Sequence, residues 1–524
     1  MSGWVRARDS VVLWAPSAVL ALAVLIPVGA LAGDLFAGGG AFQRLRSVLG
    51  EAQTWVLLGR SVGLAGGVTV IAVAIGIPFG VMLGRTDVPV RGWLLAVHAF
   101  PMFIPPFLVA LGWFHVFGVN GYLGTPTAAR MLFGPVGLLA ILGSTFAPVV
   151  TCLTALALRN VDPSLEDAAR VVARPLRVVV RILLPTAFPA VALAVLLVFA
   201  LALSELAVPM FLRVRTYPAS VMARLGGIDF APGEAVALAL PLMGVTLALL
   251  AVERRIVGEK TFAVLGLRSA ERPVFALGRW RAIATVICAS GALVSLAPLL
   301  ALLVRAVPEG IVALPQWVRS SLWNTLAAAL GAATVVTALG LTAAWRLARA
   351  SDTGRVLDGA LMLGFLTPAA VLGVGLIAAW NHEATRAIYG GVTILVLGLV
   401  ARYAIVGVRV MATGIAQSPR TLEETAAVFG ARPLGQLRRV VAPMHARGIA
   451  AGWLLTLIFC IRDLDTVVLF YPPGREPLTV RMFTLEANGP PSVVAALALT
   501  QVLLTVVLIG AAAAAASLGR SEGR

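Results

Sequence analysis

The amino-acid sequence predicts an all-α integral membrane protein with about 12 transmembrane helices, arranged as two parallel repeats of six. The 524 residues are 60% hydrophobic and 12% charged, whereas soluble domains carry roughly 25% charged residues. Twelve apolar stretches are each long enough to cross a bilayer, which takes about 20 residues. One motif also occurs twice, at a separation of about 258 residues. A soluble enzyme is therefore excluded.

The expected spans follow one another along the whole chain. Gly and Pro inside several of them are compatible with a membrane bundle, because neighbouring helices satisfy the freed backbone groups. The first stretch is kept as a span, since no Ala-x-Ala cleavage site follows its basic flank at the expected position. The spans are Val11–Leu31, Val62–Leu83, Leu94–Phe117, Val136–Leu158, Pro189–Phe211, Ala235–Val252, Ala282–Leu303, Leu322–Ala344, Leu361–Trp380, Val392–Val410, Ile449–Phe470 and Val493–Ala515.

The basic residues give the expected orientation. The 41 Lys and Arg against 24 Asp and Glu give a net charge of +17. In so apolar a chain this excess indicates loops at an anionic membrane face, with no role in nucleic-acid binding. With the N-terminus inside, about 27 basic residues lie in inner loops and about 12 in outer loops. Both termini are then cytoplasmic. Cys152, Cys288 and Cys460 lie in apolar stretches, which indicates neither a disulfide framework nor a zinc site.

The repeated motif lies in two inner loops, each between the fourth and fifth spans of its half. The copies are residues 165–185 and 422–443. Six spans per half is an even number, so both halves insert in the same direction and are related by an axis along the membrane normal. We expect a first half at 1–260 with its repeated loop at 163–188, a basic cytoplasmic linker at 261–281, and a second half at 282–524 with its loop at 420–445.

Each copy begins with two carboxylates on a short Ala-rich helix, breaks at Ala-Arg-Pro and restarts at the Pro, which is compatible with a first helical position. The carboxylates are Glu166 and Asp167 in one copy and Glu423 and Glu424 in the other. Taken alone, the acidic helix is compatible with an ordinary capped turn, and the arginines with a stripe that reaches for lipid headgroups. Two symmetric copies on one side favour a docking element for a two-fold partner.

The motif resembles the cytoplasmic coupling loop of permeases of ATP-binding-cassette importers, of the fused kind that carries both halves in one chain. The pattern is Glu-Ala-Ala, then Gly, then an apolar-x-Leu-Pro ending. The linker region at 252–281 also resembles that of fused permeases for ferric iron and thiamine. The first copy departs from the pattern because it lacks the Gly. The matching residues are Asp167, Ala168, Ala169 and Pro185 in the first copy and Glu424, Thr425, Ala426, Gly430 and Pro443 in the second.

The resemblance implies a type I importer permease in the bacterial inner membrane. It also implies two ATPase subunits docked on the coupling loops, with ATP-Mg bound by those partners, and a periplasmic solute-binding protein. The chain itself is then neither an enzyme nor a binder of any cofactor. Independently, the sequence contains no GxxxxGK[ST] phosphate loop. Ferric iron is the expected substrate, with thiamine, an aminophosphonate and a polyamine as alternatives. An ion-coupled secondary transporter with 12 spans is the competing hypothesis, supported by the loop GRTDVPVRG at 84–92.

Charged residues within the expected spans indicate the translocation pathway, because each costs at least about 2.5 kcal/mol to insert. The fifth span contains Ser204 and Glu205, and the equivalent register of the eleventh contains Arg462 and Asp463, followed by Asp465. These residues should face each other across the pseudo-two-fold axis. They either line or gate the pathway, or form a structural ion pair of Arg462 with Glu205 or Asp463. The sequence indicates no catalytic group and no metal-ligand cluster.

Overall fold

The computed structural model describes residues 2–37, 41–161, 171, 173, 175–226, 232–256, 275–349 and 351–521. Within these ranges the chain is helical, and the strand-like pairing they contain is one isolated bridge between Thr86 and Phe275. Eight helices are long and apolar enough to cross a membrane, and four bent helix pairs bring the number of spans to as many as 12. The predicted all-α membrane fold is confirmed. The eight helices are α1 (Ser2–Ala37), α3 (Ala52–Arg85), α7 (Pro135–Arg159), α14 (Pro232–Ile256), α16 (Arg281–Ala306), α17 (Glu309–Ala348), α21 (Val392–Ala416) and α27 (Pro491–Ser521).

The third and ninth spans are broken, where the sequence suggested continuous helices. In the third, α4 (Arg91–Ala99) and the 3₁₀ turn η1 (Phe100–Phe103) meet α5 (Pro106–Phe117) at 105°. In the ninth, α18 (Asp352–Leu366) meets α19 (Ala369–Trp380) at 106°. Proline removes a backbone donor and pushes the preceding residue towards extended backbone. Pro105 and Pro368 stand at the two breaks, and Ile104 and Thr367 before them have ψ of 157° and 124°.

The fifth and eleventh spans have matching structures. Each begins after a π-helical turn, at η2 (Val179–Leu183) and η6 (Leu437–Val441), and bends by 67° and 80° respectively into the membrane helix. The membrane helices α11 (Phe188–Ser204) and α25 (Ala446–Arg462) end before the predicted limits at Phe211 and Phe470. The residues that end them, Glu205 and Asp463, have nearly the same φ and ψ, −65° and 126° against −67° and 128°. The two halves thus share this break to within a few degrees.

Shorter elements complete the loops. Close to the breaks are α12 (Ala207–Phe211) and the 3₁₀ turn η7 (Val467–Leu469). The repeated loops contain α9 (Pro175–Val178), α10 (Leu184–Thr186), α22 (Thr421–Val428), α23 (Pro433–Gln436) and α24 (Ala442–Met444). The remaining described helices are α2 (Ala41–Gly50), α6 (Pro126–Leu132), α13 (Tyr217–Gly226), α20 (Arg386–Tyr389), α26 (Leu478–Asn488) and the 3₁₀ turns η4 (Gly278–Trp280) and η5 (Glu383–Thr385).

The first helix of each half packs against the other half. α1 packs against α17, α18, α19 and α21, and α16 packs against α4 and α5. Glycines permit both crossings, since a Cβ on Gly112 would lie 2.3 Å from the Pro298 carbonyl oxygen and a Cβ on Gly375 would lie 2.3 Å from that of Pro27. The two halves therefore interlock, and neither forms its full set of contacts alone.

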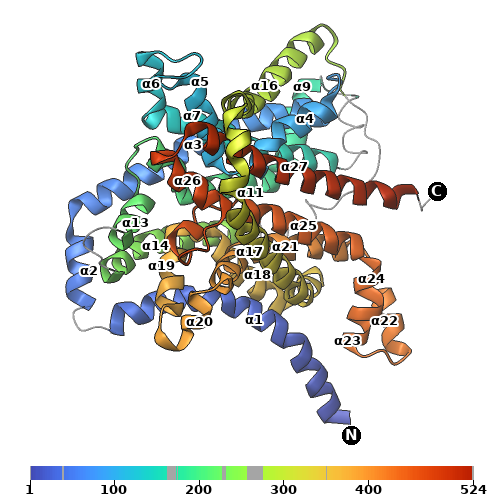
Figure 1. Ribbon diagram of the computed structural model, residues 1–524. Coiled ribbons are helices and arrows are strands. Elements are labelled where there is room, and N and C mark those ends of the chain that lie inside the picture. The colour runs from blue at the N-terminus through green and yellow to red at the C-terminus, as the bar shows by residue number, and fades with distance from the viewer. Residues whose placement is uncertain are drawn as a thin grey trace.

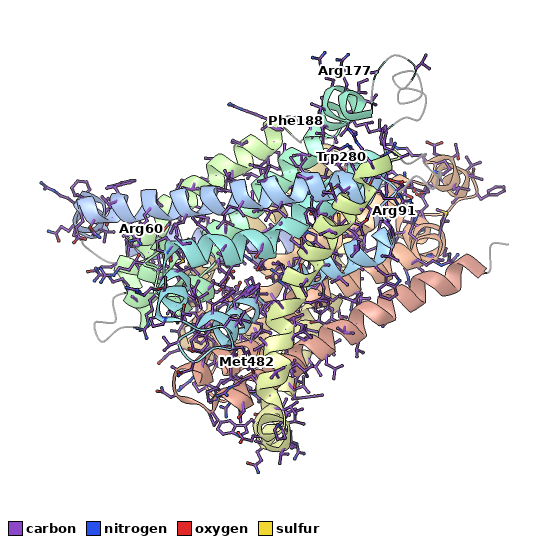
Figure 2. The ribbon with its side chains drawn as sticks, turned by 90° about the horizontal axis from the view of Figure 1, so that it is seen from above. Arg60, Arg91, Arg177, Phe188, Trp280 and Met482 are labelled. Carbon is purple, nitrogen blue, oxygen red and sulfur yellow. The ribbon has the colours of Figure 1, made fainter. Side chains whose placement is uncertain are left out.

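The elements predicted to lie on the two sides of the membrane are found at opposite ends of the helix bundle. The described ends of α1 and α27 lie on the same side as α9 and α22, and α2 and α13 lie opposite (Figure 1). Arg91, Arg177 and Trp280 lie towards one end, and Arg60 lies towards the other (Figure 2). Both repeated loops therefore face the same side of the bundle.

The chain that enters α16 is attached to the first half. Phe275 donates its N–H to the carbonyl of Arg85 at 2.8 Å, and Leu277 donates to Asp87 Oδ1 at 2.9 Å. Arg281 lies 3.8 Å from the same carboxylate. The loop at 84–92 supported the competing carrier hypothesis in the sequence analysis. In the structure it holds the chain that leads into α16, the helix that packs against the other half.

Candidate functional site

The break in the third span and the residues that end α11 and α25 line one small central cavity, together with residues of α7 and α21. It offers about 30 Å³ to water, which is room for roughly two water molecules. Its lining includes Glu205, Arg462, Asp463 and Asp465, which the sequence predicted. The predicted Ser204 is not in the lining, but its hydroxyl accepts a hydrogen bond from Arg402, which is. The lining residues are Pro105, Pro106, Phe107, Phe146, Leu201, Glu205, Arg402, Tyr403, Arg462, Asp463, Leu464 and Asp465.

Glu205 and Asp463 each cap the short turn that follows the helix break. Glu205 Oε1 accepts the N–H of Val208 at 3.3 Å. Asp463 Oδ1 accepts the N–H groups of Thr466 at 3.0 Å and Val467 at 3.2 Å, and its Oδ2 accepts the Tyr403 hydroxyl at 2.6 Å. A carboxylate in this position satisfies amide donors that the broken helix leaves free. Asp463 is therefore the more tightly bound of the two.

Asp465 joins the two halves at the centre. Its Oδ1 accepts the N–H groups of Ala207 at 3.0 Å and Leu206 at 3.3 Å. Ala207 lies 258 positions before Asp465, which is the separation of the repeat, so this contact joins two equivalent positions. A residue that touches its own pseudo-symmetry mate lies next to the pseudo-two-fold axis.

Two arginines bind carbonyls at the breaks of the third and ninth spans. Arg462 donates to the carbonyl of Met102 and lies over the Phe459 ring. Arg402 donates to the carbonyl of Thr367 and, at 2.7 Å, to the hydroxyl of Ser204. Among the described residues Arg462 forms no ion pair with Glu205 or Asp463, and its guanidinium instead donates to the Met102 carbonyl. These bonds satisfy acceptors at the helix ends.

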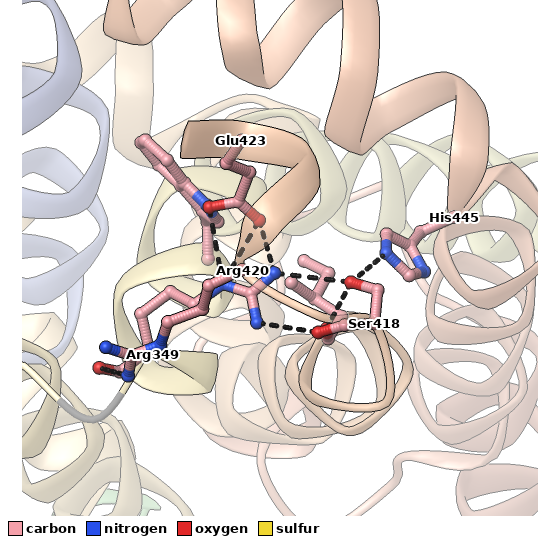
Figure 3. Close-up of polar contacts among 7 residues, drawn as sticks. Arg349, Ser418, Arg420, Glu423 and His445 are labelled. Carbon is pink, nitrogen blue, oxygen red and sulfur yellow. Dashed lines mark hydrogen bonds and ion pairs between the residues drawn. The ribbon is translucent and has the colours of Figure 1, made fainter. Parts of the chain in front are cut away.

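The adjacent carboxylates of the second repeated loop have different environments. Glu423 is 8% exposed, and Glu424 is exposed to solvent. The Glu423 carboxylate pairs with the Arg349 guanidinium and accepts the Trp345 indole N–H at 3.0 Å (Figure 3). Trp345 lies in the last turn of α17, and Arg349 is the residue that follows this helix. The Glu423 carboxylate is therefore bound by residues of its own chain, whereas the Glu424 side chain is free to contact a partner protein.

Ser418 extends this network across the loop. Arg349 donates to the Ser418 carbonyl at 3.1 Å and to its hydroxyl at 3.2 Å, and His445 Nε2 lies 3.0 Å from the same hydroxyl (Figure 3). Arg420 donates to the Arg349 carbonyl at 2.6 Å. Burial, with the nearby Arg349 charge, holds the pKa of His445 below its ordinary value of 6.5. The network joins both ends of the repeated loop to α17.

Gly430 ends α22 in the conformation that its position in the motif requires. Its φ is +82°, which L residues with a side chain rarely adopt. Ala431 donates to the Ala426 carbonyl and Gly430 to that of Ala427, each at 2.9 Å, the bonding pattern of a Schellman cap. The turn leaves Val428 85% and Phe429 87% exposed. Two exposed apolar side chains beside Glu424 form a surface suited to a partner protein.

The other predicted loop residues are placed as follows. Pro443 lies in α24, and its counterpart Pro185 lies at the same position in α10. Glu166, Asp167, Ala168 and Ala169 lie outside the described residues.

The sequence analysis missed a buried charge cluster at the side of the repeated loops. Arg409 Nε donates to Asp358 Oδ1 at 2.8 Å, and its Nη2 lies 3.0 Å from Glu253 Oε1. Arg254 lies 3.3 Å from Asp358 Oδ2. These residues come from α14, α18 and α21, so the cluster joins the last helix of the first half to the second half. Arg254 and Arg409 stand at the ends of apolar stretches, and the sequence analysis counted them only among the basic residues of the inner loops. In the described part of the chain, no three His, Cys, Asp or Glu side chains gather as a metal site.

Comparison with known proteins identifies relatives of one kind. The family model "Binding-protein-dependent transport system inner membrane component" matches residues 76–257. The ferric transport system permease protein FbpB of Actinobacillus pleuropneumoniae is 22% identical over 93% of this chain and 74% of its own length. A probable molybdenum ABC transporter permease protein of Haloferax volcanii is 33% identical over 43% of this chain and 82% of its own length. A putative 2-aminoethylphosphonate transport system permease protein, PhnV of Salmonella paratyphi A, is 31% identical over 99 residues, and the chain spans only 37% of that relative's length.

Proposed function

Since the chain belongs to the family of binding-protein-dependent transport system inner membrane components and is an ABC transporter permease, we propose that it forms the whole translocation pathway of an importer. In this proposal two ATPase subunits dock on the repeated loops, hereafter the coupling loops, and supply the energy. A periplasmic solute-binding protein delivers the substrate on the opposite side. Both termini are then cytoplasmic in a bacterial inner membrane.

The observation that carries this proposal is that Glu423 is buried and bound within the chain while the adjacent Glu424 is exposed. Arg349 holds Glu423 and thereby fixes the orientation of α22 relative to α17. The solvent-exposed surface of α22 and of the turn that follows it includes Glu424, Val428 and Phe429. A rigid connection to α17 together with an open apolar and acidic surface suits a helix that transmits movement from a soluble partner to the membrane domain.

The central cavity supports a gate in this proposal. With room for roughly two water molecules, it blocks a larger solute. The contact of Asp465 with Ala207 holds the two halves together at the axis. Opening requires this bond to break, together with the Arg402–Ser204 bond that also joins the halves. We propose that both bonds break in the open state and re-form on closure.

We propose ferric iron as the substrate. The likeness to a ferric transport permease over 93% of this chain and 74% of that relative supports it. The cavity is also lined by Glu205, Asp463, Asp465 and Tyr403, whose oxygen atoms are of the ligand type that hard cations prefer. An aminophosphonate is the second candidate, because Arg402 and Arg462 line the same cavity and guanidinium groups recognise phosphonate-like oxyanions. Thiamine and a polyamine remain lesser alternatives.

Charge reversal in both coupling loops tests the mechanism. Glu424→Lys combined with Asp167→Lys should abolish uptake of radioactive ferric iron in cells while membrane insertion stays unchanged. Glu383→Lys, an exposed carboxylate on the outer side, is the matched control and should transport normally. Unchanged uptake in the double variant would remove the coupling-loop assignment.

Energy depletion separates the importer from the competing ion-coupled carrier. Uptake should stop when ATP is removed and the ion gradient is kept, and an ATPase should co-purify with the chain. Uptake that persists under these conditions would favour the carrier. Uptake of 2-aminoethylphosphonate in place of iron would keep the mechanism and change the substrate.

A further inference from the structure

A second cavity lies at the opposite end of the first half from the coupling loops. It offers about 300 Å³ to water, at the lower end of the range for small-ligand sites, roughly 300–1,000 Å³. The helices around it are α2, the start of α3, α13 and the start of α14, which gather at one edge of the molecule (Figure 1). Its apolar walls come from Val48, Leu57 and Leu238. The central gate does not involve this cavity.

Tyr217, in the wall of this cavity, has a buried hydroxyl without a hydrogen-bond partner in the described structure. The residue is 0% exposed. Its backbone is fixed, since its N–H donates to Ser61 Oγ at 2.8 Å and its carbonyl accepts the Ser220 hydroxyl at 2.7 Å. Buried hydroxyls are rarely left without a hydrogen bond. A polar ligand group would supply the missing bond, because a tyrosine hydroxyl both donates and accepts.

The charges of the cavity favour a cationic donor. Glu51, Glu234 and Arg224 line it, and Arg224 pairs with Glu234 at 3.1 Å. Glu51 precedes α3, and its side chain makes no capping hydrogen bond to that helix. Of the two carboxylates in the lining, Glu234 pairs with Arg224, whereas the solvent-exposed Glu51 has no basic partner there. An ammonium group satisfies both this carboxylate and the Tyr217 oxygen, because it carries several N–H donors and no acceptor.

The position of the cavity points to a lipid as the source of the ammonium group. Phe42 on α2 and Trp55 and Val56 on α3 are 76%, 50% and 63% exposed. Trp55 donates its indole N–H to the Leu49 carbonyl at 2.8 Å, so its polar end is satisfied while its ring stays exposed, as in an interfacial anchor. The expected spans of α3 and α14 begin at Val62 and Ala235, ten and three residues after these helices begin. The cavity therefore lies at the level of the lipid headgroups.

We propose that this outer cavity binds the headgroup of a phospholipid with a primary ammonium group, of the phosphatidylethanolamine type. The ammonium donates to the Glu51 carboxylate and to the Tyr217 oxygen, and Arg224 supplies a guanidinium for the phosphate. The acyl chains follow the exposed apolar residues of α2 and α3. Phosphatidylcholine is the discriminating comparison, because its quaternary ammonium has the same charge and no N–H to donate.

The test uses the full-length chain in nanodiscs of phosphatidylcholine with rising fractions of phosphatidylethanolamine. Phosphatidylethanolamine should raise the thermal unfolding midpoint, and native mass spectrometry should show it retained in preference to phosphatidylcholine. Glu51→Gln and Tyr217→Phe should each lower its apparent affinity, by about tenfold or more for Glu51→Gln, which removes a charged hydrogen bond. Glu383→Gln, an exposed outer carboxylate of the other half, should keep the wild-type affinity.

Three results would overturn the proposal. Equal stabilisation of the wild-type chain by the two lipids is the first, and this comparison needs no variant that might misfold. The second is full stabilisation in pure phosphatidylcholine by free phosphoethanolamine, which would make the ligand a soluble amine. The third is an unchanged lipid affinity in Glu51→Gln together with weakened binding of a solute-binding protein, which would make the cavity a protein-docking site.

Discussion

Removing the Arg349 side chain should release the second coupling helix from the membrane domain. Arg349→Ala leaves the Glu423 carboxylate, whose side chain is 10% exposed, without its charged partner. It also removes the bonds from Arg349 to the Ser418 carbonyl and hydroxyl. Breaking a buried ion pair on one side costs about 3–5 kcal/mol. Both side chains here keep slight exposure, so we expect a cost of about 3 kcal/mol, at the low end of that range.

The loss should appear as local opening of α22. A cost of about 3 kcal/mol corresponds to an increase of about 150-fold in the open population. Hydrogen exchange of the α22 amides should therefore accelerate strongly in Arg349→Ala, with little change in α17 and α21. ATP hydrolysis by the reconstituted importer should lose its stimulation by the loaded binding protein. Asp352→Ala is the control, because that carboxylate is 91% exposed and its pair with Arg355 is worth about 0–1 kcal/mol.

A double variant distinguishes loss of the Arg349–Glu423 ion pair, hereafter the clamp, from a general loss of stability. In Arg349→Ala with Glu423→Gln the uncompensated charge is gone, and the Trp345 indole keeps an acceptor. Its exchange rate should therefore be slower than that of Arg349→Ala alone. Exchange of α22 that stays at the wild-type rate in Arg349→Ala would refute the clamp. So would a double variant in which the two effects simply add.

Three further predictions concern the gate, the buried charge cluster and pH. Asp463→Ala should lower transport and thermal stability more than Glu205→Ala does, because Asp463 accepts more hydrogen bonds than Glu205, and transport should fall more than co-purification of the ATPase. Arg409→Met should lower the free energy of unfolding in detergent by about 3–5 kcal/mol, because it leaves the Asp358 charge buried without this partner. The pKa of folded His445 lies below 6.5, so the unfolded chain binds more protons and stability should fall as pH drops below about 6.5; His445→Gln should weaken this dependence of the unfolding midpoint.

Each of these predictions has a result that contradicts it. Equal losses of transport and assembly in Asp463→Ala would make that residue structural only. A stable Arg409→Met protein would show that other groups satisfy the cluster. A pH profile of His445→Gln identical to the wild-type profile would assign the acid sensitivity to another group.

Much of the architecture was predictable, because hydropathy is a local property of each segment and the repeat can be recognised by comparing two segments of the sequence. Apolar stretches of sufficient length located the helices, and the two copies of the motif located both coupling loops. The Pro residues at 105 and 368 were visible in the sequence, yet the two bends of about 105° were not foreseen, because neighbouring helices can also tolerate Pro without a break. The early ends of α11 and α25 were missed for a related reason. Their apolar sequences continue, and only the capping of the next turn by Glu205 and Asp463 shows where each helix ends.

The sequence by itself determined the class of the protein, its repeat and the positions where charges interrupt apolar helices. Only the tertiary structure decided what those charges do. Adjacent residues such as Glu423 and Glu424 have the same chemistry, and their difference depends on Arg349, which lies more than 70 positions away and reaches only one of them. Arg462 was equally ambiguous, since it had carboxylates as well as distant backbone carbonyls to bind. A charge in a low-dielectric interior is controlled by the nearest partner in space, and that partner is set by how the interlocked halves pack.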